Sequence, residues 1–229
     1  MVDTPTSARP AASATYSISR AIAVLAGTAI CLLVAGSAVG LGLVGRHGGG
    51  PAQGWDNRVW QWAIGHRGPL IGVSKVIATV GDAPALGAIC VLLTLALWLT
   101  LRSPRALTPF VAYLGGEALV FLIREVVHRG RPLTADYPAP GAVRGVHETS
   151  YSFPSGHAVA VTAVVVALLG LLALTRGRWW PWLVALVVAA FVADTRLVLG
   201  VHWFSDVAVG LALGASWGAA VAVVARRLR

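Results

Sequence analysis

Six long apolar runs constrain the fold of this chain more than any other feature of its sequence. They cover roughly residues 21–44, 84–101, 106–127, 155–175, 180–199 and 203–225. A helix that crosses a hydrocarbon core about 30 Å thick needs about 20 residues, and each run is close to that length. The sequence therefore predicts an all-α fold, a six-span transmembrane helix bundle.

Composition supports this prediction and excludes most soluble classes. Of the 229 residues, 57% are hydrophobic and only 12% are charged, whereas a soluble domain is about 25% charged. The net charge of +9 does not indicate nucleic acid, because the basic residues lie at the ends of the runs and Lys75 is the only lysine. That layout is typical of contact with lipid headgroups. Cys31 and Cys90 lie in apolar runs, so we expect small core residues and no disulfide.

Two domains of unequal size follow from the same pattern. Residues 1–19 are rich in Pro, Ala, Ser and Thr and are expected to form a flexible cytoplasmic tail, and residues 20–229 form the six-span domain. The first run is too long for a signal-peptide core and has no clean cleavage site, so it is expected to be retained. Residues 54–81 are too polar to span. They predict an interfacial helical segment between spans one and two, with Trp55, Trp60 and Trp62 at headgroup depth.

The arginines predict the orientation of the spans. With the N-terminus inside, the inner segments contain Asp3 as their one acid and these basic residues: Arg9, Arg20, Arg102, Arg105, Arg176, Arg178, Arg226, Arg227 and Arg229. The outer segments contain both signs of charge. The positive-inside rule then predicts a plasma (inner) membrane protein with both termini in the cytoplasm.

Three clusters of ionisable residues at span ends indicate where the chemistry lies, because charges are costly there unless they are paired or solvated. The first cluster, residues 124–132, closes the third span. The second, residues 154–157, reads Pro-Ser-Gly-His and opens the fourth, and the third, residues 195–206, joins the fifth to the sixth. Counting crossings from an inside N-terminus places all three at the outer face.

Each cluster suits an oxyanion site. Arg124 and Arg131 share a helix face if the helix continues that far, and Pro132 favours a non-helical Arg131 that folds back over a ligand. Guanidinium groups bind phosphate through forked hydrogen bonds. In the second cluster, Pro154 fits the first helical position. The N–H groups of the next three residues, 155–157, would then point outward as an anion site.

The third cluster adds a histidine and a carboxylate. His202 and Asp206 are four residues apart, one helical turn, so the carboxylate can orient and stabilise the imidazole. No carboxylate cluster of the kind that holds Mg²⁺ is found in the sequence. We therefore expect no metal and no cofactor.

These three motifs resemble the signature of the type-2 phosphatidic acid phosphatase (PAP2) superfamily, which reads Lys-x6-Arg-Pro, Pro-Ser-Gly-His and Ser-Arg-x5-His-x3-Asp. The second motif matches fully. In the first, Arg124 stands where the family has Lys, and in the third, Thr195 stands for Ser. Arg124 keeps the positive charge but changes the reach and hydrogen-bond geometry of that position.

The resemblance implies a lipid phosphate phosphatase with a two-step mechanism. By similarity, His202 forms a phosphohistidine, Asp206 holds its other nitrogen, and His157 protonates the leaving alcohol and later activates water. The phosphate-binding residues implied are Arg124, Arg131, Arg196, Ser155 and Gly156. Candidate substrates are phosphatidic acid, phosphatidylglycerol phosphate and polyprenyl mono- or diphosphates.

Other functions stay open on the sequence alone. A phosphotransferase would pass the phosphoryl group to a lipid or glycan, and a silent transporter or scaffold would keep only a vestigial site. A vanadate haloperoxidase shares the anion site by resemblance but is soluble. We expect His128 and His147 to be interface histidines, Glu117 to be a bundle-facing acid, and Glu125 to pair with a site arginine. The sequence does not indicate the oligomeric state.

Overall fold

The computed structural model describes residues 17–66, 68, 70–132 and 150–228. Most of the predicted tail, residues 1–16, lies outside them. Residues 18 and 19 were assigned to the tail but belong to the first helix, α1 (Ile18–Leu43). Ser17 begins this helix as its N-cap, because its side chain accepts a hydrogen bond from the Arg20 N–H at 3.2 Å.

The predicted bundle of six spans is confirmed. Six helices in the described part of the chain are long and apolar enough to cross a membrane, so the chain is a multi-pass membrane protein. The third of them begins with a 3-10 turn, η1 (Pro104–Leu107). The spans are α1, α4 (Ala83–Leu101), η1 with α5 (Thr108–Val127), α6 (Gly156–Arg176), α7 (Trp180–Val198) and α8 (Phe204–Arg227).

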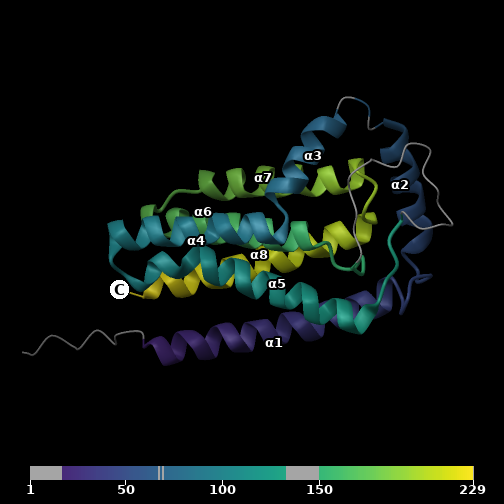
Figure 1. Cartoon of the computed structure of the whole chain (residues 1–229). Helices are drawn as coiled ribbons and strands as arrows, with labels where there is room; N and C mark the ends of the chain where they lie inside the picture. The colour runs from purple at the N-terminus through teal and green to yellow at the C-terminus, as the bar shows by residue number, and fades with distance from the viewer. Residues whose placement is uncertain (1–16, 67, 69, 133–149, 229) are drawn as a thin grey trace, which may run out of the picture.

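The segment between the first two spans forms the expected pair of helices, α2 (Gln53–His66) and α3 (Leu70–Val80). Both lie at one end of the bundle, where α3 packs on α7, and α2 contacts α7 and α8 (Figure 1). Trp60 contradicts the expected headgroup position because it is only 7% exposed. Its indole N–H donates to the Gly200 carbonyl at 3.1 Å and its ring packs on Trp203.

The closest helix pair is α6 with α8, which run parallel and both begin at the end of the bundle that carries α2. A glycine stripe on α8 permits the approach. A Cβ on Gly214 would lie 2.4 Å from the Val159 carbonyl oxygen, and one on Gly218 would lie 2.5 Å from that of Ala163. Small residues allow membrane helices to pack backbone to backbone. This stripe therefore holds the backbones of α6 and α8 side by side.

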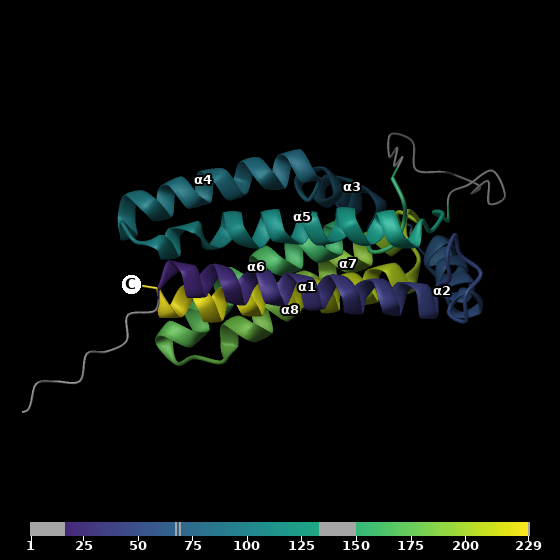
Figure 2. The same cartoon turned by 90° about the horizontal axis from the view of Figure 1, so that it is seen from below.

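The outer helices pack more loosely. α1 lies against α5 and α8, and α4 lies against α5 on the far side (Figure 2). Cys90 on α4 is buried beside Leu86 and Ala112, but Cys31 on α1 is exposed, so the expectation of a core position is wrong for Cys31. Most of α1 faces outward, so the surrounding lipid rather than the protein would cover it.

The end opposite α2 carries arginines. Arg105 in η1 donates to the carbonyl oxygens of Leu228 at 2.7 Å and Arg226 at 3.0 Å, which satisfies the C-terminal end of α8. The start of α1 and the end of α8 both lie at this end (Figure 1), as an even number of spans requires.

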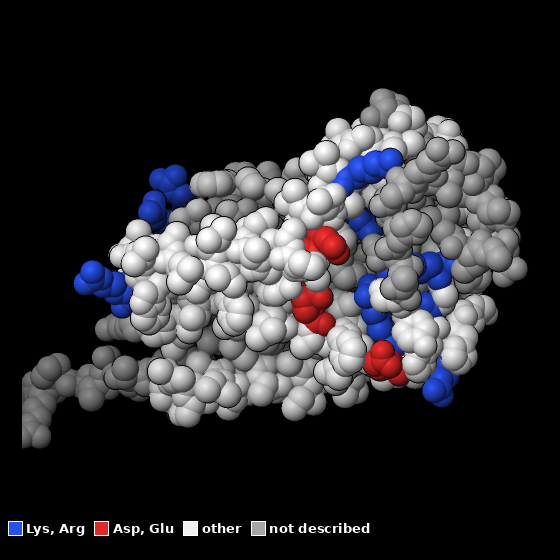
Figure 3. All heavy atoms as spheres, in the orientation of Figure 1, with Lys and Arg blue, Asp and Glu red and all other residues white. Residues whose placement is uncertain are grey.

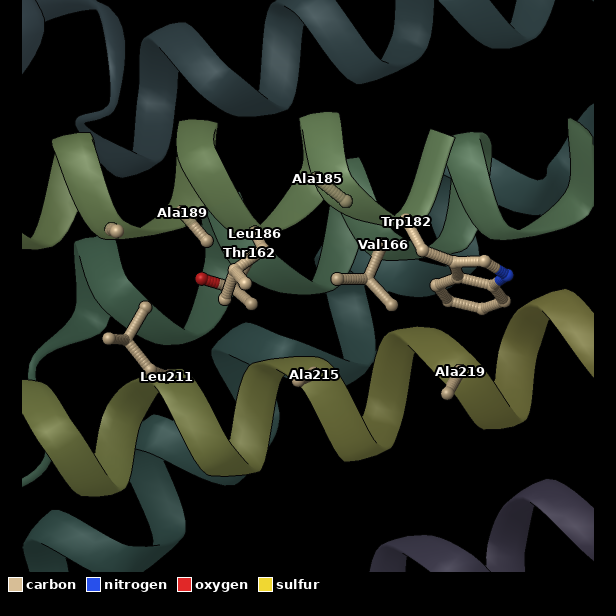
Figure 4. Close-up of a pocket in the computed structure, with 10 residues that line it drawn as sticks. Thr162, Val166, Trp182, Ala185, Leu186, Ala189, Leu211, Ala215 and Ala219 are labelled. Atoms are coloured by element: carbon tan, nitrogen blue, oxygen red, sulfur yellow. The ribbon is translucent and has the colours of Figure 1, made fainter. Parts of the chain in front are cut away.

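A groove between α6, α7 and α8 has a volume of about 310 Å³ (Figure 4). The Thr162 hydroxyl and the Trp182 indole are the polar groups of its lining, and small side chains such as Ala189 and Ala215 line much of the rest. A lining with no charged group is unsuited to a phosphate. The candidate site therefore lies elsewhere, at the end of the bundle where α6 and α8 begin.

Candidate active site

The three sequence clusters meet at the α2 end of the bundle, which combines the end of α5, the start of α6 and the turn from α7 to α8. Basic side chains gather there in a hollow, with acidic side chains at its edge (Figure 3). The segments that meet come from distant parts of the chain. Arg131 and His202 are 71 residues apart in the sequence, and their side chains are 3.1 Å apart.

The start of α6 differs from the expectation. Pro154 is not the first helical residue, because α6 begins at Gly156 and Ser155 is its N-cap. The Ser155 N–H donates to the Asp206 carbonyl oxygen at 3.1 Å, so it is not directed outward as predicted. The Ser155 hydroxyl is buried and has no hydrogen-bond partner among the described residues. It is therefore a donor that an anion could satisfy.

The two arginines of the first motif converge, but they do not share a helix face as predicted. α5 ends at Val127, and His128 adopts a left-handed conformation with φ 53°, so the helix does not reach Arg131. Arg131 nevertheless folds back, as Pro132 predicts. Arg124 and Arg131 donate to the same Ser150 hydroxyl oxygen at 3.0 Å and 3.1 Å, so both guanidinium groups point at one position.

His202 also differs from the predicted helical pair. α8 begins at Phe204, so His202 precedes the helix, and its Nδ1 lies 3.4 Å from Asp206 Oδ2. Its Nε2 lies 3.1 Å from Arg131 Nη1. A guanidinium group can only donate, so Nε2 must accept, and the ring proton lies on Nδ1. The imidazole therefore carries its lone pair at Nε2, on the side of the arginines.

The surroundings of His202 favour its neutral form. The side chain is 1% exposed, and this burial lowers the pKa of His202 well below its ordinary value. The positive charges of Arg131 and Arg196 lower it further. Arg196 is fully buried in the last turn of α7. A neutral imidazole with a lone pair directed at cationic groups can act as a nucleophile toward a bound anion.

His157 lies on the other side of the site, in the first turn of α6. Its Nε2 lies 2.8 Å from the Ala78 carbonyl oxygen of α3. Because a carbonyl only accepts, Nε2 donates. Gly81, which follows α3, lies against the same ring, since a Cβ there would be 2.7 Å from His157 Cδ2. The short helix α3 therefore determines where this imidazole sits.

Four buried residues near His202 were not identified from the sequence: Asp56, Arg129, Ser152 and Ser205. Arg129 donates to Asp206 Oδ1 at 2.7 Å and to Asp56 Oδ2 at 2.6 Å, and the Ser152 hydroxyl donates to Asp206 Oδ2. The sequence did offer a signal, because Arg129 lies two residues before Arg131 in an apolar chain. Only the fold shows which of the two arginines faces His202.

A pocket of about 490 Å³ opens beside Arg124. Its lining is Glu117, Val120, Phe121, Arg124, Glu125, Ser150 and Tyr151. Glu117 was expected to face the bundle. It is half-buried, and it faces a pocket that also contains Arg124.

The other polar residues near the site are placed as follows. Glu125 Oε2 lies 3.8 Å from His128 Nε2, where a pairing with an arginine was expected. The His128 ring stacks on His47 and packs edge-on against Tyr151. His147 lies outside the described residues.

The donor set of the site suits an oxyanion. Within the described ranges, no group of three or more His, Cys, Asp or Glu side chains is placed to hold a metal ion. The groups that converge are guanidiniums, the Ser155 hydroxyl and the start of α6. Gly156 lies against Arg124, whose Nη2 would be 3.4 Å from a Cβ there.

Comparison with known proteins gives one family match. The family model described as the PAP2 superfamily matches residues 105–229, more than half of the chain. All three motifs lie within that match.

Several named proteins are similar to part of this chain. Decaprenylphosphoryl-5-phosphoribose phosphatase of Mycobacterium tuberculosis is 42% identical over 112 residues, which cover 49% of this chain and 54% of the relative. Undecaprenyl-diphosphatase of Sulfolobus acidocaldarius is 44% identical over 69 residues, 30% of this chain and 31% of the relative. Phosphatidylglycerophosphatase B of Bacillus subtilis is 33% identical over 98 residues, which cover 41% of this chain and 44% of the relative. The chain spans about half the length, or less, of the relatives it matches.

One solved structure resembles the whole fold. The crystal structure of a transmembrane PAP2 type phosphatidylglycerolphosphate phosphatase from Bacillus subtilis superposes with a TM-score of 0.66. The match covers 86% of this chain and 93% of the other at 24% identity. At that identity the likeness establishes the six-span fold and no more.

Proposed function

We propose that this chain, which belongs to the PAP2 superfamily, hydrolyses the phosphate of a membrane lipid through a phosphohistidine on His202. The observation that carries the proposal is the state of that imidazole. Its Nδ1 faces Asp206 at 3.4 Å, while its Nε2 accepts from Arg131 at 3.1 Å and so carries a lone pair. This tautomer can attack phosphorus without first losing a proton.

The phosphate would bind where the arginines converge. The Ser150 hydroxyl oxygen accepts from both Arg124 and Arg131, and an anionic phosphate oxygen is a stronger acceptor for the same donors. Arg131 would exchange its contact with His202 Nε2 for a phosphate oxygen, which exposes the nucleophile only when substrate is present. Arg196, the Ser155 hydroxyl and the Gly156 N–H would hold the remaining oxygens.

The first chemical step forms a bond between His202 Nε2 and phosphorus and breaks the phosphorus–oxygen bond to the lipid. The imidazolium form of His157 donates a proton to the leaving oxygen and becomes neutral, for which it has to release the Ala78 carbonyl. In the second step His157 takes a proton from water as the water oxygen attacks phosphorus. The phosphorus–nitrogen electron pair then returns to Nε2, and inorganic phosphate leaves.

The substrate class is a lipid phosphate or lipid diphosphate. The relatives' names refer to a phosphorylated prenyl sugar, a prenyl diphosphate and a phosphatidylglycerol phosphate. These compounds share a phosphate on a lipid that lies in the bilayer. A site at the end of a six-span bundle suits such a substrate, because the phosphate can reach the arginines while the tail stays in the hydrocarbon. Three arginines can neutralise the dianion, so no metal is required.

The topology proposed with this function places both termini in the cytoplasm and the site at the outer face of a plasma membrane. Arginines gather at the end opposite the site, as the positive-inside rule requires of cytoplasmic loops. The test compares Arg46→Cys, at the site end, with Arg178→Cys in a background without Cys31 and Cys90. An impermeant thiol reagent on intact cells should label position 46 and leave position 178 unlabelled. The reverse labelling would contradict the topology.

Activity itself is tested with purified protein in detergent and a panel of lipid phosphates and diphosphates. Phosphate release should persist with EDTA. Vanadate should inhibit it, because vanadate mimics the trigonal-bipyramidal transfer state. A Mg²⁺ requirement after chelation would contradict the proposed site, and transfer to an added lipid or glycan in place of water would identify a phosphotransferase.

A further inference from the structure

The two oxygens of the Asp206 carboxylate have different partners. Oδ2 faces His202 Nδ1 at 3.4 Å and also accepts from the Trp203 N–H at 2.9 Å and from the Ser152 hydroxyl. Oδ1 accepts from Arg129 Nη1 at 2.7 Å. Arg129 therefore holds the far side of the carboxylate and determines which oxygen is directed at the histidine.

Arg129 is held in turn by a carboxylate of α2. Its Nη2 lies 2.6 Å from Asp56 Oδ2 and 3.0 Å from Gln53 Oε1. Arg129 is 1% exposed, and the side chains of Asp56 and Asp206 are fully buried. A charge buried this deeply is very costly without its partner. The three residues therefore behave as one unit in which each charge requires the others.

Asp56 has a second contact, with the start of α8. Its Oδ1 accepts from the Ser205 N–H at 2.8 Å, and its Oδ2 accepts from the Ser205 hydroxyl at 2.6 Å. The first N–H groups of a helix have no intrahelical acceptor and are normally satisfied by the N-cap side chain. The N-cap of α8 is Trp203, whose indole only donates. A carboxylate from α2 therefore supplies the missing cap directly beside His202.

We infer that Asp56 and Arg129 are positioning residues for the nucleophile. Asp56 holds Arg129, Arg129 directs Asp206, and Asp206 keeps the His202 proton on Nδ1 so that the Nε2 lone pair faces the phosphate. The inference rests on the proposed role of His202.

The charges of this unit fit the reaction. Asp56, Arg129 and Asp206 together carry one net negative charge. As Nε2 bonds to phosphorus, the imidazole becomes positive, and a preorganised negative unit stabilises that change. Removing the charge of Asp56 leaves Arg129 to neutralise Asp206, so less negative potential reaches the ring. The loss should therefore appear in kcat rather than in KM.

The first test uses Asp56→Asn, which keeps an acceptor for the Ser205 N–H, and Arg129→Met. Asp194→Asn and Arg58→Met are the matched controls, because both residues are exposed and lie outside the network. Each network variant should lower kcat per folded molecule by about 100-fold, the scale expected of a misplaced catalytic group, with KM little changed. Arg129→Lys should recover part of the loss, since it keeps the charge without the fork. Network variants with the activity of their controls would overturn the inference.

The second test asks whether the two residues act through Asp206. In an Asp206→Asn background, Arg129→Met should cause little further loss of the phosphorylation rate, because the group it directs is already disabled. Losses that multiply in full would show that Arg129 acts independently and would overturn the inference.

The third test does not depend on turnover. The ¹⁵N shifts of the His202 imidazole should report a proton on Nδ1 in the wild type and a mixture of tautomers in Asp56→Asn and Arg129→Met. A purely structural role would lower thermal stability but leave the tautomer of the folded protein unchanged, which would overturn the inference. A wild type that releases no phosphate from any lipid would contradict the proposed function, and the tautomer comparison would still test the inference.

Discussion

His202 and His157 lie at the same end of the bundle, but the structure holds them in different ways. His202 is 1% exposed, with Asp206 on one nitrogen and Arg131 on the other, and the carboxylate is itself bound by Arg129. His157 donates to a neutral acceptor, the Ala78 carbonyl oxygen. Charged groups from spans and loops hold the first ring, whereas a short helix outside the six spans holds the second.

This difference matches what each histidine has to do in the proposed mechanism. A nucleophile needs one tautomer and one direction, and buried charges can impose both. An acid that later acts as a base has to exchange its proton twice, so a permanent charged partner would hinder it. A carbonyl is a partner that the ring can leave at small cost, since a neutral hydrogen bond contributes about 1 kcal/mol. The comparison predicts that the two histidines respond differently to substitution.

The largest effect is expected for His202→Ala. The variant should lose turnover and phosphoenzyme formation on every substrate, by at least about 10⁴-fold, the scale of coupled catalytic groups. Removing the attacking atom leaves no alternative route in the site. Steady-state phosphate release with a lipid phosphate, a lipid diphosphate and p-nitrophenyl phosphate tests this, and substantial release from any of them would remove His202 from the nucleophile role.

A smaller effect that depends on the leaving group is expected for His157→Ala. Protonation of the leaving oxygen is worth about 10² to 10⁴-fold, and a good leaving group does not need it. The rate of phosphoenzyme formation in the variant should therefore fall far less with p-nitrophenyl phosphate than with a monoalkyl phosphate. Equal losses on the two substrates would overturn the assignment of His157 as the acid.

A still smaller effect is expected from moving the His157 ring without removing it. In Gly81→Ala the new Cβ would lie 2.7 Å from His157 Cδ2, whereas Gly72→Ala, also in the α3 region, adds a Cβ to open space. Gly81→Ala should lose about 10-fold in kcat, since small misplacements of a catalytic group are costly, and Gly72→Ala should match the wild type. Identical kinetics of the two variants would mean that α3 does not set the position of the acid.

The smallest effect is expected from a modest fall in pH. Burial and the nearby arginines lower the pKa of His202, so its reactive neutral form persists as the pH falls through about 6.5, the ordinary value for histidine. The acid limb of the pH profile of kcat/KM, which reports the free enzyme, should therefore lie well below that value. An acid limb at the ordinary histidine value that belongs to His202 would contradict the neutral buried ring. The limb is assigned to His202 if the matching transition in the imidazole ¹⁵N titration is missing from His202→Ala.

The spans and the three motif clusters could be predicted because each is a local pattern: a long apolar run, or a short charged motif at its end. The contacts that orient the motifs could not. Asp56 lies 73 residues from Arg129 and 149 from Ser205, so its role depends on how α2 packs. The helix start predicted at Pro154 is two residues too early for the same reason. The Ser155 N–H donates to the Asp206 carbonyl oxygen of a distant segment, and α6 begins only at Gly156.

The position of Trp60 also depends on how α2 packs. Three tryptophans in one polar segment indicate an interface, and Trp55 and Trp62 are indeed exposed, at 58% and 63%. Trp60 lies on the other face of α2, where its N–H meets a carbonyl of the turn between α7 and α8. The glycine stripe of α8 was not predicted either, although Gly210, Gly214 and Gly218 recur at intervals of four residues in the sequence.

Trapping the covalent intermediate tests whether His202 is the nucleophile. Wild-type protein is mixed with a ³²P-labelled lipid phosphate, quenched in alkali, which preserves phosphohistidine, and digested for peptide mapping. If His202 is the nucleophile, we expect one labelled residue, His202, and no label in His202→Ala. Label should accumulate in His157→Ala when the leaving group is good, because the water step then lacks its base. Label on His157, label that persists in His202→Ala, or turnover without any labelled residue would contradict the nucleophile role of His202.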